Sequence, residues 1–202
     1  MSTTTMDRTV DLMLRCGALM KGHFRLTSGL HSDEYCQCAR VLEHPETAEE
    51  LGKMLAGFYE GKKVDTVVSP AIGGIVIGHE VARALGVRSL FAERTERGMT
   101  LRRGFQLEPG ERVLIIEDVV TTGGSVKEVA EAVKAAGAEV VGFGFVMDRS
   151  REPLNLPAPS RALVEGREMV TYQPEACPLC EAGVPIDKPG SRPDSEGDDG
   201  GN

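Results

Sequence analysis

Two adjacent acidic residues, Glu117 and Asp118, directly follow the apolar run at residues 113–116, and hydroxyl and glycine residues then extend to Ser125. Glycine lets backbone amides approach a ligand closely, and the start of a helix presents unpaired N–H groups, so such a turn is suited to a phosphate. The carboxylates can accept hydrogen bonds from vicinal ribose hydroxyls or approach a divalent metal. The segment therefore predicts a site for a substrate of the ribose 5-phosphate type.

A plain strand-to-helix turn is the alternative interpretation of this segment. It accounts for Gly123 and Gly124, because tight turns use glycine. It does not account for two acids at the end of an apolar strand, because a buried carboxylate without a partner is costly. We therefore favour a functional site.

Helical and strand patterns alternate along the chain. Apolar residues at helical spacing predict helices, and short β-branched runs predict strands. The expected elements are a helix from about Met6, extended segments at 23–26 and 35–41, a helix from a capping box at 47–50, a strand at 64–69, a helix at 74–85, strands at 87–92 and 113–116, a helix at 125–136 and a strand at 140–147. This order predicts an α/β fold with a central, mostly parallel sheet flanked by helices. Ligands of such sheets bind at the carboxyl ends of the strands, where the two acids stand.

A polar segment at residues 94–104 interrupts the alternation. It contains four arginines, Arg94, Arg97, Arg102 and Arg103. Between two strands, such a segment is either a mobile lid over the site or a solvated loop. Composition alone leaves both interpretations open.

The composition of the 202-residue chain is that of an ordinary globular protein, with 41% hydrophobic and 27% charged residues. A net charge of −8 makes nucleic acid a poor partner. No apolar run is long enough to span a bilayer and no secretory signal is evident, so we expect a cytoplasmic protein without a membrane partner. The five cysteines, an odd number, indicate no disulfide framework. The Gly-, Asp-, Ser- and Pro-rich tail at 189–202 is expected to be disordered.

Residues 113–125 closely resemble the signature of the type I phosphoribosyltransferases, which bind 5-phosphoribosyl 1-diphosphate (PRPP). The match covers thirteen residues with few degenerate positions. The resemblance implies that Glu117 and Asp118 contact the ribose hydroxyls of PRPP. It also implies that the following residues bind the 5-phosphate: Val119, Val120, Thr121, Thr122, Gly123, Gly124 and Ser125.

The implied architecture is a single phosphoribosyltransferase domain at residues 1–188. It would consist of a small N-terminal hood at 1–45, an α/β core at 46–172 and a C-terminal turn at 173–188. The resemblance covers roughly residues 5–185, which is nearly the whole chain before the tail.

Three further segments are similar to the orotate-specific members of this family. Residues 22–35 look like the start of those enzymes, residues 70–74 resemble their diphosphate-binding loop, and residues 147–149 resemble the strand end whose arginine binds the orotate carboxylate. A bidentate arginine suits a carboxylate. The residues that the resemblance places around orotate are Arg149, Tyr35 and Thr121, with Cys36 lining the pocket.

The cations of the chain depart from those of the well-known members. Their catalytic loop carries lysines and a histidine, whereas residues 94–103 have neither. Lysines of those members are also replaced by Thr27 and Gly73. Arg94 matches plainly, and the other loop arginines can replace the missing cations. The catalytic candidates are therefore Asp118, Arg94, Arg97, Arg102 and Arg103.

The resemblance implies transfer of the phosphoribosyl group of PRPP to orotate, giving orotidine 5-monophosphate and diphosphate. Mg²⁺ would be bound largely through PRPP, without a metal site of the protein's own, and loop 94–104 would reach the neighbouring site of a homodimer. A purine phosphoribosyltransferase and a PRPP-sensing regulator are the alternatives. The orotate-like N-terminal segment and Arg149 argue against the first, and the acidic chain without a nucleic-acid-binding segment argues against the second.

Cys177 and Cys180 form one CxxC motif near the C-terminus. A zinc site needs about four ligands. Cys36 and Cys38 would supply the other two only if the tail folds back onto the N-terminal region. Packing of a C-terminal turn is therefore the favoured role of this motif.

Two histidines, His23 and His31, belong to the predicted hood. His31 is expected either to border the site or to lie on the surface, and the sequence favours neither position.

Overall fold

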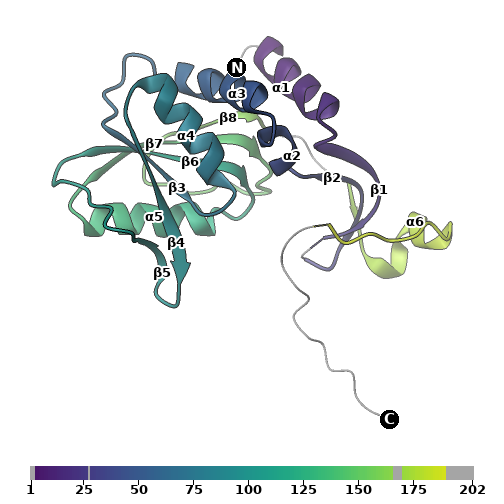
Figure 1. Ribbon diagram of the computed structural model, residues 1–202. Helices are drawn as coiled ribbons and strands as arrows, with labels where there is room; N and C mark the ends of the chain where they lie inside the picture. Colours follow the sequence, from purple (N-terminus) through teal and green to yellow (C-terminus); the bar gives the residue numbers. More distant parts are fainter. Residues whose placement is uncertain (1–2, 27, 166–169, 190–202) are drawn as a thin grey trace.

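The computed structural model describes residues 3–26, 28–165 and 170–189 (Figure 1). The helices are α1 (Thr3–Arg15), α2 (Ala39–Leu42), α3 (Pro45–Gly57), α4 (Gly74–Leu85), α5 (Gly124–Ala135), the 3-10 helix η1 (Pro174–Ala176) and α6 (Pro178–Glu181). The strands are β1 (Leu19–Arg25), β2 (His31–Cys36), β3 (Thr66–Pro70), β4 (Arg88–Thr95), β5 (Gly98–Leu101), β6 (Arg112–Val120), β7 (Glu139–Asp148), β8 (Ser160–Val164) and β9 (Thr171–Tyr172). No helix among these is long and apolar enough to cross a bilayer. Of the predicted tail, residues 190–202 lie outside the described residues, as does Thr27.

Six strands form the central sheet in the order β5-β4-β3-β6-β7-β8. The pairs among β4, β3, β6, β7 and β8 are parallel, and β5 at one edge runs antiparallel to β4. The predicted α/β fold with a mostly parallel sheet is therefore confirmed. The helices predicted at 74–85 and 125–136 correspond to α4 and α5, within one residue at each end.

Strand β6 is apolar on both faces because helices cover both sides of the sheet. Leu114 and Ile116 pack in the cluster that includes residues of α3 and α4, whereas Val113 and Ile115 pack in the cluster that includes residues of α5. Figure 1 shows α5 across the sheet from α3 and α4. This double cover buries the centre of β6 and leaves its carboxyl end at the edge of the core.

A second sheet, in the order β1-β2-β9, forms the hood, and its pairs are antiparallel. The C-terminal segment, residues 173–188, also joins this sheet. The Arg25 amide donates to the Asp187 carbonyl at 2.8 Å, and the Asp187 amide donates to the His23 carbonyl at 2.7 Å. Figure 1 accordingly shows α6 beside the end of β1 and β2. The chain before the tail therefore does fold back onto the N-terminal region.

Three local predictions were wrong. The extended segment expected at 35–41 ends at Cys36, because residues 39–42 form α2. The capping box at 47–50 is not used, since α3 already begins at Pro45, whose fixed φ suits the first helical position. The polar segment at 94–104 is not a single loop, because β4 continues to Thr95 and turns back as β5.

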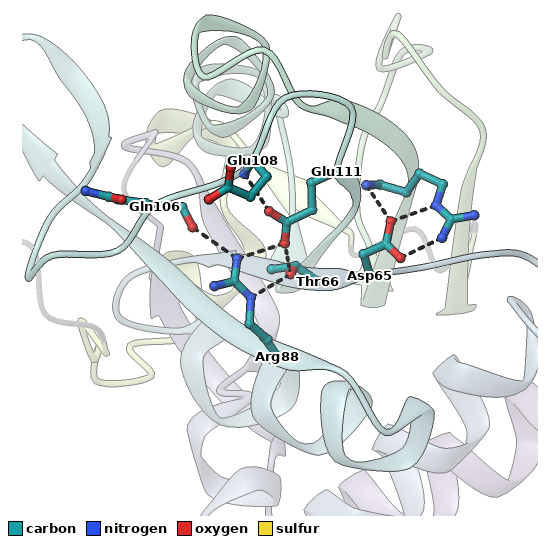
Figure 2. Close-up of polar contacts among 7 residues, drawn as sticks. Asp65, Thr66, Arg88, Gln106, Glu108 and Glu111 are labelled. Atoms are coloured by element: carbon teal, nitrogen blue, oxygen red, sulfur yellow. Dashed lines mark hydrogen bonds and ion pairs between the residues drawn. The ribbon is translucent and has the colours of Figure 1, made fainter.

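Polar side chains at the amino end of the sheet hold the connection from this hairpin to β6 (Figure 2). Arg88 donates to the Glu111 carboxylate at 2.8 Å and to the Gln106 carbonyl at 3.0 Å. Glu111 also accepts hydrogen bonds from the Thr66 hydroxyl and, at 2.7 Å, from the Glu108 amide. The connection between β5 and β6 is thus held against the first residues of β3 and β4.

Candidate active site

Glu117 and Asp118 lie near the carboxyl end of β6, in the middle of the sheet. Glu117 is only 9% exposed, and Asp118 is half-buried. The Asp118 amide donates to Oε1 of Glu117 at 3.1 Å, and the Val119 amide donates to Oδ1 of Asp118 at 2.8 Å. The structure therefore holds both carboxyl groups at one place, as the sequence predicted.

The environment of Glu117 strongly favours its neutral form. Burial raises the pKa of Glu117 to about 9, and the charge and hydrogen bonding of Asp118 act in the same direction. The bond from the Asp118 amide opposes this shift without compensating for it. Glu117 is therefore protonated at neutral pH in the ligand-free protein. Such a strongly raised pKa is typical of carboxyl groups in ligand-binding sites.

The segment at residues 70–74, between β3 and α4, packs directly against both acids. A Cβ atom on Gly73 would lie 2.8 Å from both carboxylate oxygens of Asp118. A Cβ atom on Gly74 would lie 2.9 Å from Oε1 of Glu117. Glycine at both positions leaves room for the carboxyl groups. The segment that resembles a diphosphate-binding loop thus borders the acids.

A cavity of about 220 Å³ opens at the turn between β6 and α5. Gly123 has a φ of 74°, a left-handed conformation that favours glycine and lets the chain enter α5. The first amides of α5 are free of intrahelical partners, as at any helix start. The cavity is lined by Arg94, Glu117, Val119, Val120, Thr121, Thr122, Gly123, Gly124, Ser125, Val126 and Glu128. The predicted turn residues therefore do enclose a space with the features of an anion site.

A larger cavity, of about 570 Å³, lies between β5 and the second half of α5. Its walls include Met99, Phe105 and Ala132, but neither acid and none of the loop arginines. The larger cavity therefore lacks the acidic and arginine side chains that line or border the smaller one.

Arg94 extends from β4 to the turn between β6 and α5, residues 119–125. Its guanidinium donates to Glu128 and, at 3.4 Å, to the Ser125 hydroxyl. Glu128 also accepts a hydrogen bond from the Met99 amide at 3.0 Å, so it joins α5 to the hairpin. Sequence reasoning missed Glu128, and no local pattern distinguishes it from other exposed helical acids.

The other loop arginines point elsewhere in this structure. Arg103 pairs with Glu93 at 2.8 Å, and its guanidinium lies 5.8 Å from the centre of the Phe91 ring. Arg97 and Arg102 are exposed. Of the four predicted cations, the structure brings Arg94 to the turn and leaves the other three on the hairpin or just after it.

Tyr35 of the hood and Arg149 of the core share an electrostatic environment with Asp118. Burial raises the pKa of Tyr35, the charge of Arg149 lowers it, and the charges of Cys36 and Asp118 raise it further. Arg149 directly follows β7, and its amide donates to the Val120 carbonyl of β6 at 2.9 Å. The hood therefore meets the core at the end of β6 that carries the acids.

Cys38 belongs to the same neighbourhood, although sequence reasoning gave it no role there. A hydrogen bond with Cys36 and complete burial raise its pKa well above the ordinary value, and the charge of Asp118 adds to this effect. The close spacing of the two cysteines in the sequence was the signal available.

Comparisons with known proteins show which family the chain belongs to. A family profile described as "Phosphoribosyl transferase domain" matches residues 37–161. The orotate phosphoribosyltransferase of Pelotomaculum thermopropionicum is 54% identical over 188 residues, which make up 93% of this chain and 98% of that protein. The chain belongs to the orotate phosphoribosyltransferase family. Another member of the orotate phosphoribosyltransferase family, from Thermotoga maritima, is 50% identical over 90% of this chain and 97% of that protein.

Solved structures support the fold. The orotate phosphoribosyltransferase of Aeropyrum pernix matches with a TM-score of 0.64 at 21% identity, covering 77% of this chain and 92% of that one. The adenine phosphoribosyltransferase of Thermoanaerobacter pseudethanolicus matches with a TM-score of 0.56 at 23% identity, covering 66% and 88%. Enzymes for both bases share the architecture, so it is sequence similarity that assigns the chain to the orotate phosphoribosyltransferase family.

Proposed function

We propose that this protein transfers the phosphoribosyl group of PRPP to orotate, giving orotidine 5-monophosphate and diphosphate in pyrimidine synthesis. The proposal is supported by the convergence of the turn at residues 119–125, the two acids, Arg149 and Tyr35 at the carboxyl end of β6, in a chain of this family. A cytoplasmic location is consistent with this role and forms part of the proposal.

PRPP would lie along the turn between β6 and α5. The amides and hydroxyls from Val119 to Ser125 would bind its 5-phosphate, which a helix start favours. Glu117 and Asp118 would accept hydrogen bonds from the ribose hydroxyls. Two carboxyl groups also suit Mg²⁺, which prefers oxygen ligands and is often bound through substrate phosphates. When bound, Mg²⁺ supplies positive charge to the diphosphate of PRPP.

Orotate would lie between the hood and the core. The guanidinium of Arg149 would pair with the orotate carboxylate, while Tyr35 and Thr121 would contact the ring. These three residues come from β2, the turn after β6 and the end of β7. This placement would bring the ring to the ribose of PRPP, because the acids occupy the same edge of the sheet.

In the transfer step, a ring nitrogen of orotate attacks the anomeric carbon as the bond to diphosphate breaks. The proton of that nitrogen is lost to solvent, and the electron pair of the broken bond leaves with diphosphate. The protein mainly positions the reactants and stabilises charge. Arg94 would act from beside Ser125, and Arg97, Arg102 and Arg103 would neutralise the departing diphosphate after the hairpin moves.

A test of the reaction follows the ultraviolet absorbance of orotate. Mixing the protein with orotate, PRPP and Mg²⁺ should lower this absorbance, and chelation of Mg²⁺ should stop the decrease. Adenine in place of orotate is the matched control and should give no product. Turnover of adenine without turnover of orotate would overturn the proposal.

The tip of the β4–β5 hairpin projects away from the helices in Figure 1, and Arg97 and Arg102 are exposed on the segment. As part of the proposal, this hairpin reaches the active site of a second copy in a homodimer. We therefore expect an equal mixture of the Asp118→Asn and Arg103→Ala variants, after subunit exchange, to regain up to about a quarter of the wild-type activity. Random exchange makes about half of the dimers mixed, and one of the two sites in each mixed dimer is intact. Activity no greater than that of the separate variants would contradict shared sites.

A further inference from the structure

Four side chains outside the proposed active site converge where the C-terminal segment meets the hood. His23 lies on β1 and His31 on β2. Cys177 immediately precedes α6, and Cys180 lies within α6. One potential ligand atom from each lies within 4.8 Å of all the others. The reaction proposed above uses none of them, so their convergence needs its own explanation.

Four of the distances between these atoms are close to those of a tetrahedral metal site. Zinc–sulfur bonds of about 2.3 Å and zinc–nitrogen bonds of about 2.0 Å place sulfur and nitrogen about 3.5 Å apart, and two nitrogens about 3.3 Å apart. Nε2 of His23 lies 3.5 Å from Sγ of Cys177 and 3.7 Å from Sγ of Cys180. Nδ1 of His31 lies 3.3 Å from Sγ of Cys180 and 3.0 Å from Nε2 of His23.

Burial and orientation also suit a metal. His23 and His31 are 3% and 6% exposed, which rules out the surface position considered for His31, and Cys177 is fully buried, whereas Cys180 is exposed at the edge of the cluster. The other ring nitrogen of His23, Nδ1, lies 2.8 Å from the Val184 carbonyl and can donate to it. A proton on Nδ1 leaves the lone pair of Nε2 directed at the cluster, which is the usual support of a metal-binding histidine.

We propose that His23, His31, Cys177 and Cys180 bind one Zn²⁺ ion. Two imidazoles and two thiolates form a Cys₂His₂ set that completes four-coordination without water, as in structural rather than catalytic zinc sites. Soft sulfur ligands disfavour Mg²⁺, so this site is distinct from the one that Mg²⁺ would share with PRPP.

The ion would join the C-terminal segment to the hood. The segment otherwise holds to β1 through the two backbone hydrogen bonds of Asp187 and the Val184 contact. Because β2 also carries Tyr35, the metal would stabilise the strand that presents this side chain to orotate. Sequence reasoning considered Cys36 and Cys38 as further ligands and favoured packing of a C-terminal turn for the CxxC motif. The structure instead brings two histidines to this motif.

The direct test loads the reduced, metal-free full chain with Co²⁺ as a spectroscopic probe. We expect one equivalent to produce the intense visible bands of tetrahedral cobalt and a thiolate-to-cobalt charge-transfer band, and Zn²⁺ should displace it. The absence of these bands in protein whose thiols are shown to be reduced would overturn the proposal. Formation of a Cys177–Cys180 disulfide that persists in a mild thiol buffer, with no metal uptake, would overturn it as well.

Variants then assign the ligands. Cys180→Ser and His31→Gln should each lower Zn²⁺ affinity by at least about 100-fold, and Cys180→Ser should also reduce the charge-transfer band. Cys16→Ser is the matched control, because Cys16 lies outside the cluster, and it should leave both properties unchanged. Equal zinc affinity in Cys180→Ser and the wild type would contradict the assignment. Each outcome is independent of orotate turnover, so this proposal and the proposed function can fail separately.

Zinc should also protect the C-terminal segment. In limited proteolysis of the wild-type chain, removal of zinc is expected to speed cleavage near residues 173–188 by about tenfold or more, because local opening then breaks fewer contacts. Restoring Zn²⁺ should reverse the effect, and Mg²⁺ should not. A cleavage rate that does not depend on zinc would count against a structural role for the ion.

Discussion

Replacing Arg149 by alanine should raise the KM for orotate by about 100-fold or more, with a smaller effect on the KM for PRPP. The physical reason is the loss of a charge-assisted pair with the orotate carboxylate, which costs on the order of 2–4 kcal/mol. Steady-state kinetics and calorimetric titration of orotate would measure both effects. Arg149→Lys should recover only part of the loss, because lysine cannot bind a carboxylate in the bidentate geometry of arginine.

Arg151→Ala is the matched control for this prediction. Arg151 is an exposed arginine two residues further along, and it donates to the Thr171 hydroxyl at 2.9 Å. We expect its replacement to leave the KM for orotate within about twofold of wild type, as for most surface substitutions. An unchanged KM in Arg149→Ala would remove Arg149 from the orotate site.

Replacing Glu117 by glutamine should weaken PRPP binding and at the same time stabilise the ligand-free protein. The carboxyl group of Glu117 has a folded-state pKa of about 9, against an ordinary value of 4.5. The folded state therefore binds this proton more tightly than the unfolded state does, so the free energy of unfolding falls as the pH rises from about 4.5 toward 9. Glutamine does not titrate, so the free energy of unfolding of the variant does not fall in this way as the pH rises.

The stability gain of Glu117→Gln should thus depend on pH. We expect little difference from wild type near pH 4.5 and a gain on the order of 1–3 kcal/mol near pH 8, measured by chemical unfolding. PRPP affinity should fall by about tenfold or more, because an amide replaces a group that accepts ribose hydroxyls as a carboxylate. Glu131→Gln, at an exposed position of α5, should change neither quantity. A gain that does not vary with pH would show that burial does not hold Glu117 neutral.

A related expectation concerns the ligand itself. If PRPP with Mg²⁺ requires ionised Glu117, binding near neutral pH releases a proton, and PRPP affinity rises with pH toward about 9. Function and stability therefore conflict at this residue. Such conflicts are common where a site holds a group in an unfavourable state for its ligand.

The sequence by itself determined the strand, turn and helix that form the candidate phosphate site. The apolar run of β6, the two acids, Gly123 and the pattern of α5 all lie within one continuous segment, residues 112–135, so local propensity and periodicity suffice to predict them. The parallel sheet also follows from the alternation of strands and helices. Segments in which strand pairing overrides local propensity were harder to predict. Residues 98–101, in the middle of the polar segment, form β5 because they pair with the edge of β4.

Only the tertiary structure decided how distant segments meet. The approach of Gly73 and Gly74 to the acids and the raised pKa of Glu117 depend on packing between β3, α4 and β6. The meeting of His23 with Cys177 depends on the return of the C-terminal segment to the hood. These contacts join residues far apart in the chain, and burial and backbone pairing place them rather than any local pattern. For that reason the sequence alone could not predict that the four proposed zinc ligands lie together.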